Sequence, residues 1–142
     1  FLANRKANLS EEDLTLWQNN FLGLAIDEYR RLKKIFDHRT FDDGEVLIHL
    51  GQDNSFLFFV TAGQLVVHRN GQDIGVVDRG GVAGEMSFLT EALPNADVVA
   101  SGGASCILID KAKLRALMMK HPTFHLSMTN VFNLNLMKKL AS

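Results

Sequence analysis

One segment in the middle of the chain has the residues of a candidate anion site. Gly84-Glu85-Met86-Ser87-Phe88-Leu89 lacks the alternation of a strand, and Gly80 and Gly81 precede it. A short helix that begins near Gly84 would direct its first backbone N–H groups outward. These donors and the helix dipole both favour a negative charge. Because most helix starts bind only water, the segment predicts an anion site only when a further signal accompanies it.

No other group of residues forms a set with which catalysis would be expected. His121 and His125 have a spacing that permits a metal ion, but no acidic third ligand lies nearby in the sequence. Cys106 lies in an apolar run and is predicted to be a small core residue rather than a nucleophile. None of the serines has the glycine context of a nucleophile elbow. We therefore expect no enzyme activity, no metal site and no cofactor.

The composition is that of one globular domain over residues 1–142. Hydrophobic residues make up 46% of the chain and charged residues 22%, an average balance for a domain of this length. The formal net charge of −1 makes nucleic-acid binding by this chain unexpected. A single cysteine excludes an internal disulfide and favours a reducing compartment, so we expect a cytoplasmic location. No apolar run reaches the roughly 20 residues that a membrane span needs.

Residues 38–110 form a glycine-rich block of short β-branched and aromatic runs. A turn signal bounds each run, and Asn70-Gly71 is the strongest hairpin signal in the chain. The spacing leaves no room for the helices of alternating β–α units. Many short strands with glycine turns predict an antiparallel sandwich or barrel. The expected strands lie within residues 46–50, 56–60, 65–67, 74–77, 98–99 and 106–109.

Helical patterns precede this block, in residues 1–37. Ser10 is a predicted cap for a helix to about Gln18, and a second pattern runs from Ala25 to Phe36. The polar face of the second helix is basic. It is typical of a solvated surface, and contact with anionic lipid or nucleic acid is the alternative. The charged residues of this face are Glu28, Arg30, Arg31, Lys33 and Lys34.

Two more helices are predicted in residues 111–142. Asp110 can cap a helix that runs to Lys120, and His121-Pro122 ends that helix and opens the last one. The last helix has a broad apolar stripe, and we expect its first half to pack on the β block. The end of the stripe either packs there as well or forms the seam of a homodimer.

The order of these elements and the glycine spacing resemble the cyclic nucleotide-binding domain family. The resemblance covers about residues 20–140 and implies a mainly β fold, an eight-stranded antiparallel jelly roll (a double-stranded β-helix) with flanking helices. It also implies a regulatory signalling module whose ligand is cyclic AMP or cyclic GMP. The matching pattern is Phe41-x-x-Gly44-Glu45-x-Leu47-Ile48, Gly51, Leu57-x-Phe59-Val60-x-x-Gly63-x-Leu65-x-Val67, Gly80 and the segment from Gly84 to Leu89.

In that family, a phosphate-binding cassette holds the cyclic phosphodiester at the N-terminus of a short internal helix. The resemblance places the first half of the cassette at Gly84, Glu85, Met86 and Ser87. It implies that the backbone N–H groups of the Gly-Glu pair bind the ligand and that the Glu85 carboxylate accepts the ribose 2′-OH.

The second half of the cassette departs from the family pattern. Asn95 stands where the family has an arginine, Ala96 where it has Ser or Thr, and Asp97 where it has a small residue. Arginine is a permanent cation, whereas Asn95 offers at most two neutral donors. Losing one hydrogen bond to a charged group weakens binding about tenfold to a hundredfold. We expect weak binding or a different small anionic ligand; Arg69 and Arg79 are candidate substitute cations, although both are typical of solvated turns.

A narrower resemblance concerns the context of the domain. Gly84-to-Thr90 and Leu136-x-x-Lys139-Leu140 are most similar to bacterial relatives of the Popeye membrane proteins, in which such a domain follows transmembrane helices. Phe1-to-Lys6 passes from apolar to basic, as the cytoplasmic end of a membrane helix does. A membrane tether before Phe1 is therefore expected. Two alternatives stay open: a ligand-free interaction or dimerisation module on the same fold, and the N-terminal sensor fragment of a transcription regulator.

Overall fold

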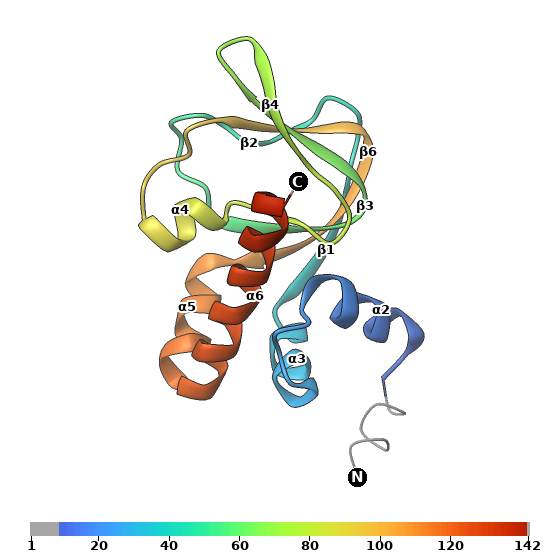
Figure 1. The fold of residues 1–142 in the computed structure, drawn as a ribbon, viewed down its shortest axis with the longest axis vertical. Coiled ribbons are helices and arrows are strands. Elements are labelled where there is room, and N and C mark those ends of the chain that lie inside the picture. The colour runs from blue at the N-terminus through green and yellow to red at the C-terminus, as the bar shows by residue number, and fades with distance from the viewer. Residues whose placement is uncertain (1–8, 142) are drawn as a thin grey trace. The chain divides into compact units, whose positions relative to one another are not determined.

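The structure is a computed structural model that describes residues 9–141, with the side chains of residues 9–137. The chain divides into two compact units (Figure 1). The β unit comprises Phe36–Lys113, and the helical unit comprises the described residues up to Ile35 and those from Leu114 onwards. The apolar-to-basic segment from Phe1 to Lys6 lies outside the described residues, as does the side chain of Leu140 in the predicted apolar stripe.

The β unit is an antiparallel sheet with one short helix inserted before its last strand. The strand order is β1-β6-β3-β4, with β2 paired to β6 and β5 paired to β3. This arrangement confirms the antiparallel β fold with flanking helices that the sequence predicts. The elements are β1 (Phe36–Phe41), β2 (Val46–Ile48), β3 (Phe56–Arg69), β4 (Gln72–Val77), β5 (Val82–Ala83), α4 (Glu85–Thr90) and β6 (Asp97–Asp110).

Two strands of 14 residues, β3 and β6, form the spine of the sheet. They pair from Phe56 with Asp110 to His68 with Asp97, and the register shifts on both sides of Ala62. Each strand therefore continues through a bend as one element. For this reason the described residues contain six strands rather than the eight that the family resemblance implies.

The bend depends on a close approach of two backbones at Gly63. Gly63 has a φ of +73°, and a Cβ atom added there would lie 2.2 Å from the carbonyl oxygen of Gly103. Any other residue would clash with that oxygen and would also be strained at this φ. Gly63 is therefore required for the close approach of β3 and β6 at the bend.

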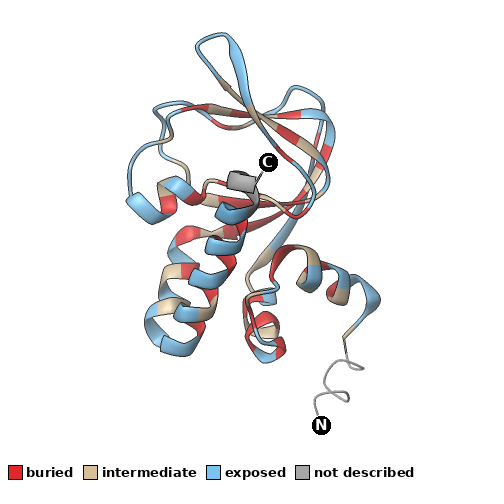
Figure 2. Cartoon of the chain, in the orientation of Figure 1, coloured by how far each residue is buried: buried red, intermediate tan, exposed pale blue. Residues whose placement is uncertain are grey.

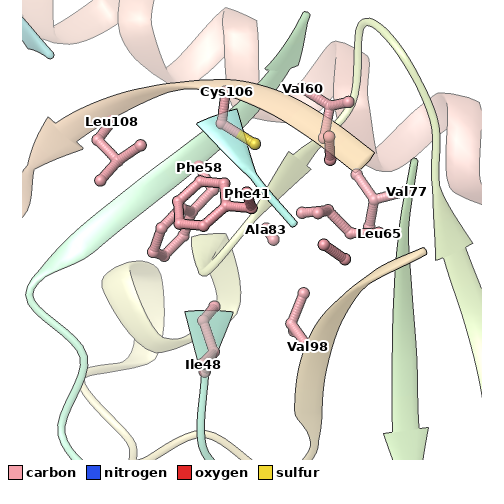
Figure 3. Close-up of a cluster of buried hydrophobic side chains, with 12 residues drawn as sticks. Phe41, Ile48, Phe58, Val60, Leu65, Val77, Ala83, Val98, Cys106 and Leu108 are labelled. Atoms are coloured by element: carbon pink, nitrogen blue, oxygen red, sulfur yellow. The ribbon is translucent and has the colours of Figure 1, made fainter. Parts of the chain in front are cut away.

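Alternate residues of the long strands fill the interior of the β unit (Figure 3). Phe41 and Phe58 pack edge to face with their ring centroids 6.1 Å apart. Cys106 is buried in this core, as predicted, and burial raises the pKa of its thiol to about 11. The core comprises Phe41, Ile48, Phe58, Val60, Leu65, Val77, Ala83, Val98, Ala100, Ala104, Cys106 and Leu108.

The helical unit contains two short helices from the start of the chain and two from its end. Ser10 caps the first helix, because its Oγ accepts the Asp13 backbone N–H at 3.0 Å. Figure 2 shows buried and exposed residues alternating along each of these helices, as expected for two-sided packing. The helices are α2 (Glu11–Asn20), α3 (Ile26–Lys33), α5 (Lys111–Lys120) and α6 (Pro122–Ala141), with the first three residues of α5 belonging to the β unit.

The predicted end of α3 at Phe36 is wrong. The helix ends at Lys33, and the Ile35 N–H bonds the Leu32 carbonyl in a tight turn. Phe36 instead opens β1 and pairs with Ile109 of β6. Its apolar spacing fits a helix, but pairing with a long central strand satisfies its backbone and overrides the local pattern.

A buried carboxylate joins α2 to α3. Asp13 accepts hydrogen bonds from the Tyr29 hydroxyl at 2.7 Å, from Lys33 Nζ at 2.6 Å and from Ser10 Oγ at 3.1 Å. Burial alone would raise the pKa of the Asp13 carboxyl, but these three hydrogen bonds outweigh burial and hold the pKa below its usual value. The ionised carboxylate therefore stabilises the folded helical unit.

The first prediction concerns the close approach of β3 and β6 at Gly63. Gly63→Ala should lower the free energy of unfolding by about 3 kcal/mol or more, because it adds a backbone clash to the cost of a positive φ. Gly102→Ala is the matched control, since Gly102 also has a φ of +73° but its added Cβ meets nothing within 4 Å. It should cost about 1 kcal/mol. Urea unfolding followed by circular dichroism measures both, and equal losses would contradict the clash.

The second prediction concerns Asp13. Asp13→Asn should destabilise the protein by about 1–2 kcal/mol at pH 7, where the native carboxylate is ionised. Because the folded pKa is depressed, the stabilisation is present above the unfolded value of 3.8 and is lost as the pH falls towards the folded value. The gap between wild type and variant in urea midpoint should narrow at about pH 3. Glu12→Gln is the control, because Glu12 is exposed in the same turn. It should leave the urea midpoint unchanged at both pH values.

Candidate functional site

Strand β3 fixes the place at which α4 begins. The short strand β5 pairs with β3 through Ala83 and Phe58, and Gly84 follows directly. Gly84 has a φ of +91°, and an added Cβ would lie 2.9 Å from the Phe56 carbonyl oxygen and 3.1 Å from Asn54 Nδ2. Only glycine allows the chain to turn into α4 this close to β3. The structure thus places the predicted helix start at Gly84.

The first turn of α4 has the geometry expected of an anion site. Its first hydrogen bond runs from the Phe88 N–H to the Gly84 carbonyl at 3.2 Å, so the amides of residues 85–87 precede that bond. The Glu85 side chain is only 3% exposed, and its Oε2 is buried. Met86 is 60% exposed and Ser87 is half-buried. The turn therefore combines backbone donors with an enclosed carboxylate, which is the donor and acceptor set that a sugar phosphate requires.

The other three predicted residues lie where the chain enters β6. Asn95 is exposed and Ala96 is buried. The Asp97 carboxylate accepts the backbone N–H of Leu50 at 2.7 Å. Asp97 therefore holds the segment after β2.

One segment, residues 48–54, lies against both halves of the candidate site. Next to the first half, Ile48 Cδ1 is 3.6 Å from the position of an added Gly84 Cβ. Next to the second half, Ile48 pairs with Val98, and Gly51 donates to the Pro94 carbonyl at 2.8 Å. The start of α4 and the entry to β6 are thus held around the same backbone, although they are ten residues apart in the chain.

Arg79 lies too far along β3 to replace an arginine at position 95. The turn that contains it is tied to β3 at Val60, whose N–H bonds the Gly81 carbonyl at 3.0 Å. Gly84, by contrast, meets β3 at Phe56. Four residues of strand, or about 13 Å, separate these two points.

Arg69 is placed differently, because it ends β3 beside the entry to β6. His68 and Asp97 are partners in the β3–β6 ladder. This is the last pair of the ladder, and Arg69 and Ala96 are the residues that follow it along the two chain segments. Arg69 also has the strand parity of Val67, whose partner Val98 is a core residue. Arg69 is exposed and lies one residue beyond the end of the ladder that leads to the second half of the site.

Sequence reasoning missed two residues that build the site. Asn54 Nδ2 donates to the Phe56 carbonyl at 2.7 Å, and the Phe56 N–H donates to Asn54 Oδ1 at 3.2 Å. The signal for Asn54 was its position two residues before a strand, because asparagine side chains commonly bond the backbone two residues further on. The contact of Leu50 with Asp97 had no signal, because 47 residues separate the two.

The β unit as a whole is acidic. It contains five Lys and Arg against eleven Asp and Glu, a net charge of −6 with histidines neutral. A negative unit repels an anionic ligand at long range. Among the described residues, no group of three or more His, Cys, Asp and Glu side chains is placed to hold a metal ion.

Comparison with known proteins decides the family. The model of the cyclic nucleotide-binding domain matches residues 38–121. The chain belongs to the cyclic nucleotide-binding domain family. It is 32% identical over 110 residues to a cAMP-dependent protein kinase regulatory subunit of Blastocladiella emersonii, with 72% of this chain and 27% of that protein covered. Members of this family are regulatory domains.

Solved structures share the fold. A putative cyclic nucleotide-binding protein from Geobacter metallireducens superposes with a TM-score of 0.80 at 17% identity, covering 93% of this chain and 98% of that one. A cyclic nucleotide-binding domain from Methylobacillus flagellatus gives a TM-score of 0.76 at 18% identity, covering 88% and 78%. These neighbours confirm the jelly roll predicted for this chain.

The chain spans about a quarter of the length of the regulatory subunit that it matches. Across the part of the chain that the structure describes, no helix has both the length and the apolar character to cross a membrane.

Proposed function

We propose that this domain is a regulatory cyclic-nucleotide sensor whose affinity for cyclic AMP and cyclic GMP is weak. The observation that carries the proposal is the pairing of a complete Gly84–Glu85 turn with a neutral Asn95 at the entry to β6. The proposed ligand contacts are Gly84, Glu85, Met86 and Ser87 in the first half, and Asn95 and Ala96 in the second, with Asp97 holding the adjacent segment.

The physical basis of the weak affinity is the missing positive charge. A cyclic nucleotide carries one negative charge, and Asn95 supplies only neutral donors to it. The net charge of −6 on the β unit adds an unfavourable field. Asp97 repels an anionic ligand less than a carboxylate without hydrogen bonds would, because its Oδ1 accepts the Leu50 N–H.

Arg69 supplies the residual positive charge in this proposal. It lies at the end of β3, one residue beyond the ladder with β6, and its side chain is exposed and able to reorient. An arginine there offers the same fork of donors as one at position 95, but from a hairpin end and at a greater distance. It therefore recovers part of the lost affinity.

A second candidate function is a ligand-free interaction module. Three large apolar side chains around the site favour it: Met86 is 60% exposed, Leu89 55% and Leu93 59%. Such a group of exposed apolar residues is typical of a surface that binds another protein. A binding experiment separates this alternative from the sensor.

The wider context that we propose is a cytoplasmic domain tethered to a membrane upstream of Phe1, as in the Popeye relatives. The support is the resemblance of the Gly84-to-Thr90 segment and the apolar-to-basic order of Phe1 to Lys6. Exposed apolar residues of α6, which include Leu134, Leu136 and Met137, support a homodimer through the terminal helices. A sensor fragment of a transcription regulator remains the alternative context.

Asn95→Arg tests the central proposal. Isothermal titration with cyclic AMP and with cyclic GMP should show weak binding by the wild-type domain. Binding should tighten by about tenfold to a hundredfold in Asn95→Arg, because a charged hydrogen bond is restored. Asn95→Gln is the control, since it keeps a neutral amide and should not tighten binding. A sub-micromolar wild-type dissociation constant would contradict the proposal, and no heat from either protein would favour the interaction module.

Arg69→Gln tests the residual charge. We expect cyclic AMP affinity to fall about fivefold to tenfold, which is the contribution of one partly exposed charged hydrogen bond. Arg79→Gln removes the same charge from a turn that meets β3 about 13 Å from the contact with Gly84. This variant should leave the affinity unchanged. In the Asn95→Arg background, the Arg69 effect should shrink, because two cations then share one phosphate. Equal losses in the two single variants would mean that only overall charge matters.

A further inference from the structure

The two units of the chain carry opposite charge. The β unit has a net charge of −6, whereas the described residues of the helical unit have eight Lys and Arg against five Asp and Glu, a net charge of +3. From Lys111 to Ser142 the chain contains six Lys and Arg and no Asp or Glu. An overall charge of −1 therefore conceals opposite net charges in the two parts of the sequence.

Part of this positive charge gathers at the turn between α5 and α6. His121 forms that turn, and its N-terminal neighbour Lys120 is exposed. Partial burial lowers the pKa of His121, and the charges of Arg31 and Lys120 lower it further. The segment before α3 packs on α6, because a Cβ added at Gly23 would lie 2.8 Å from the Val131 nitrogen. The effect of Arg31 on His121 agrees with this packing and indicates that the end of α3 lies towards the turn. Lys34 lies one helical turn beyond Arg31 and extends the basic surface.

The other two cations of α3 are committed to carboxylates of the helical unit. Arg30 Nη1 lies 3.7 Å from Asp27 Oδ1, and Lys33 Nζ donates to Asp13 at 2.6 Å. Arg31 and Lys34 are therefore the side chains that α3 contributes to the surface at the turn.

Large apolar side chains project from the same turn. Met119 is 85% exposed and Leu126 is 70% exposed, and they lie on either side of His121. Figure 2 shows that the end of the α5–α6 hairpin is largely exposed. Leu126 is only about 6 Å along α6 from Pro122, so both apolar side chains belong to the tip of the hairpin. We name Arg31, Lys34, Met119, Lys120, His121 and Leu126 the hairpin tip.

We propose that the hairpin tip docks the helical unit onto an anionic membrane surface. Lys and Arg next to lipid headgroups attract the negative surface, and Met and Leu side chains insert among the acyl chains. A nucleic acid would use the cations but would gain little from Met119 and Leu126. The inference is independent of whether the β unit binds a nucleotide.

Vesicle sedimentation of the 142-residue chain without nucleotide tests the proposal. The protein should partition onto phosphatidylcholine vesicles that contain about 30% phosphatidylserine, and not onto pure phosphatidylcholine. Raising the salt to about 0.5 M should release it, because exposed charges are then screened. The triple variant Arg31→Gln, Lys34→Gln, Lys120→Gln should lower the partition coefficient about a hundredfold, since each cation near such a surface contributes about fivefold.

Two further variants separate the contributions. Met119→Ser with Leu126→Ser keeps the net charge and should lower the partition coefficient about tenfold, through the loss of apolar burial. Arg39→Gln with Arg79→Gln and Lys113→Gln removes three cations from the β unit and should not weaken vesicle binding. Circular dichroism confirms that each variant is folded.

Three results would overturn the proposal. The first is equal binding to neutral and anionic vesicles, and the second is vesicle binding that survives the triple variant at the hairpin tip. The third is binding to soluble polyglutamate or duplex DNA, unaffected by the serine variant, without any vesicle binding. That last result would assign the basic surface to a soluble polyanion.

Discussion

The candidate site depends on the contact between the Gly84 backbone and the first residue of β3. The carbonyl of Phe56 lies where a side chain at position 84 would begin, and Asn54 holds that carbonyl in place by a hydrogen bond of 2.7 Å. This contact fixes where α4 starts and which direction its first N–H groups take. It involves no group at the entry to β6, so it persists whichever residue occupies position 95. A member of this family can therefore keep the donor turn and lose the cation, because the two halves of the site are stabilised by different interactions.

The distribution of charge gives this separation a consequence for binding. An arginine at position 95 would both bind the phosphate directly and reduce the negative field of the β unit. Without it, the unit that contains the site has a net charge of −6, and the described residues of the helical unit have a charge of +3. The electrostatic attraction of this chain for anions thus lies on the helices rather than at the site. Composition averaged over the chain hides this, since the two charges partly cancel.

The sequence predicted those features that depend on local chemistry. Asn70 and Gly71 adopt the positive φ values of +54° and +77° expected of a tight hairpin, and Ser10 caps α2. The turn at Gly84 was predicted because glycine and a following acidic residue are local signals. The antiparallel β fold followed from the number and spacing of short apolar runs.

Features that depend on residues distant in the chain were not predictable. The hydrogen bond from Leu50 to Asp97, and the place of Arg69 one residue beyond the β3–β6 ladder, both follow from the register of β6. Register is set by the packing of a whole face and cannot be read from one segment. The end of α3 was predicted wrongly for the same reason, because Phe36 pairs with Ile109 of β6 instead of continuing the helix.

The links between the two units limit how a ligand at this site would act on the helices. The chain passes from β6 into α5 without a loop, because Asp110 ends the strand and Lys111 begins the helix. At this junction the Lys111 N–H bonds the Ser55 carbonyl at 2.9 Å, next to the residues that hold Gly84. A ligand can bias two arrangements only by the ratio of its affinities for them. A site that discriminates tenfold between arrangements shifts their balance by about 1.4 kcal/mol, far from the 5.5 kcal/mol of a complete switch. Weak affinity raises the ligand concentration that is required, whereas the size of the conformational shift depends on the ratio of the two affinities.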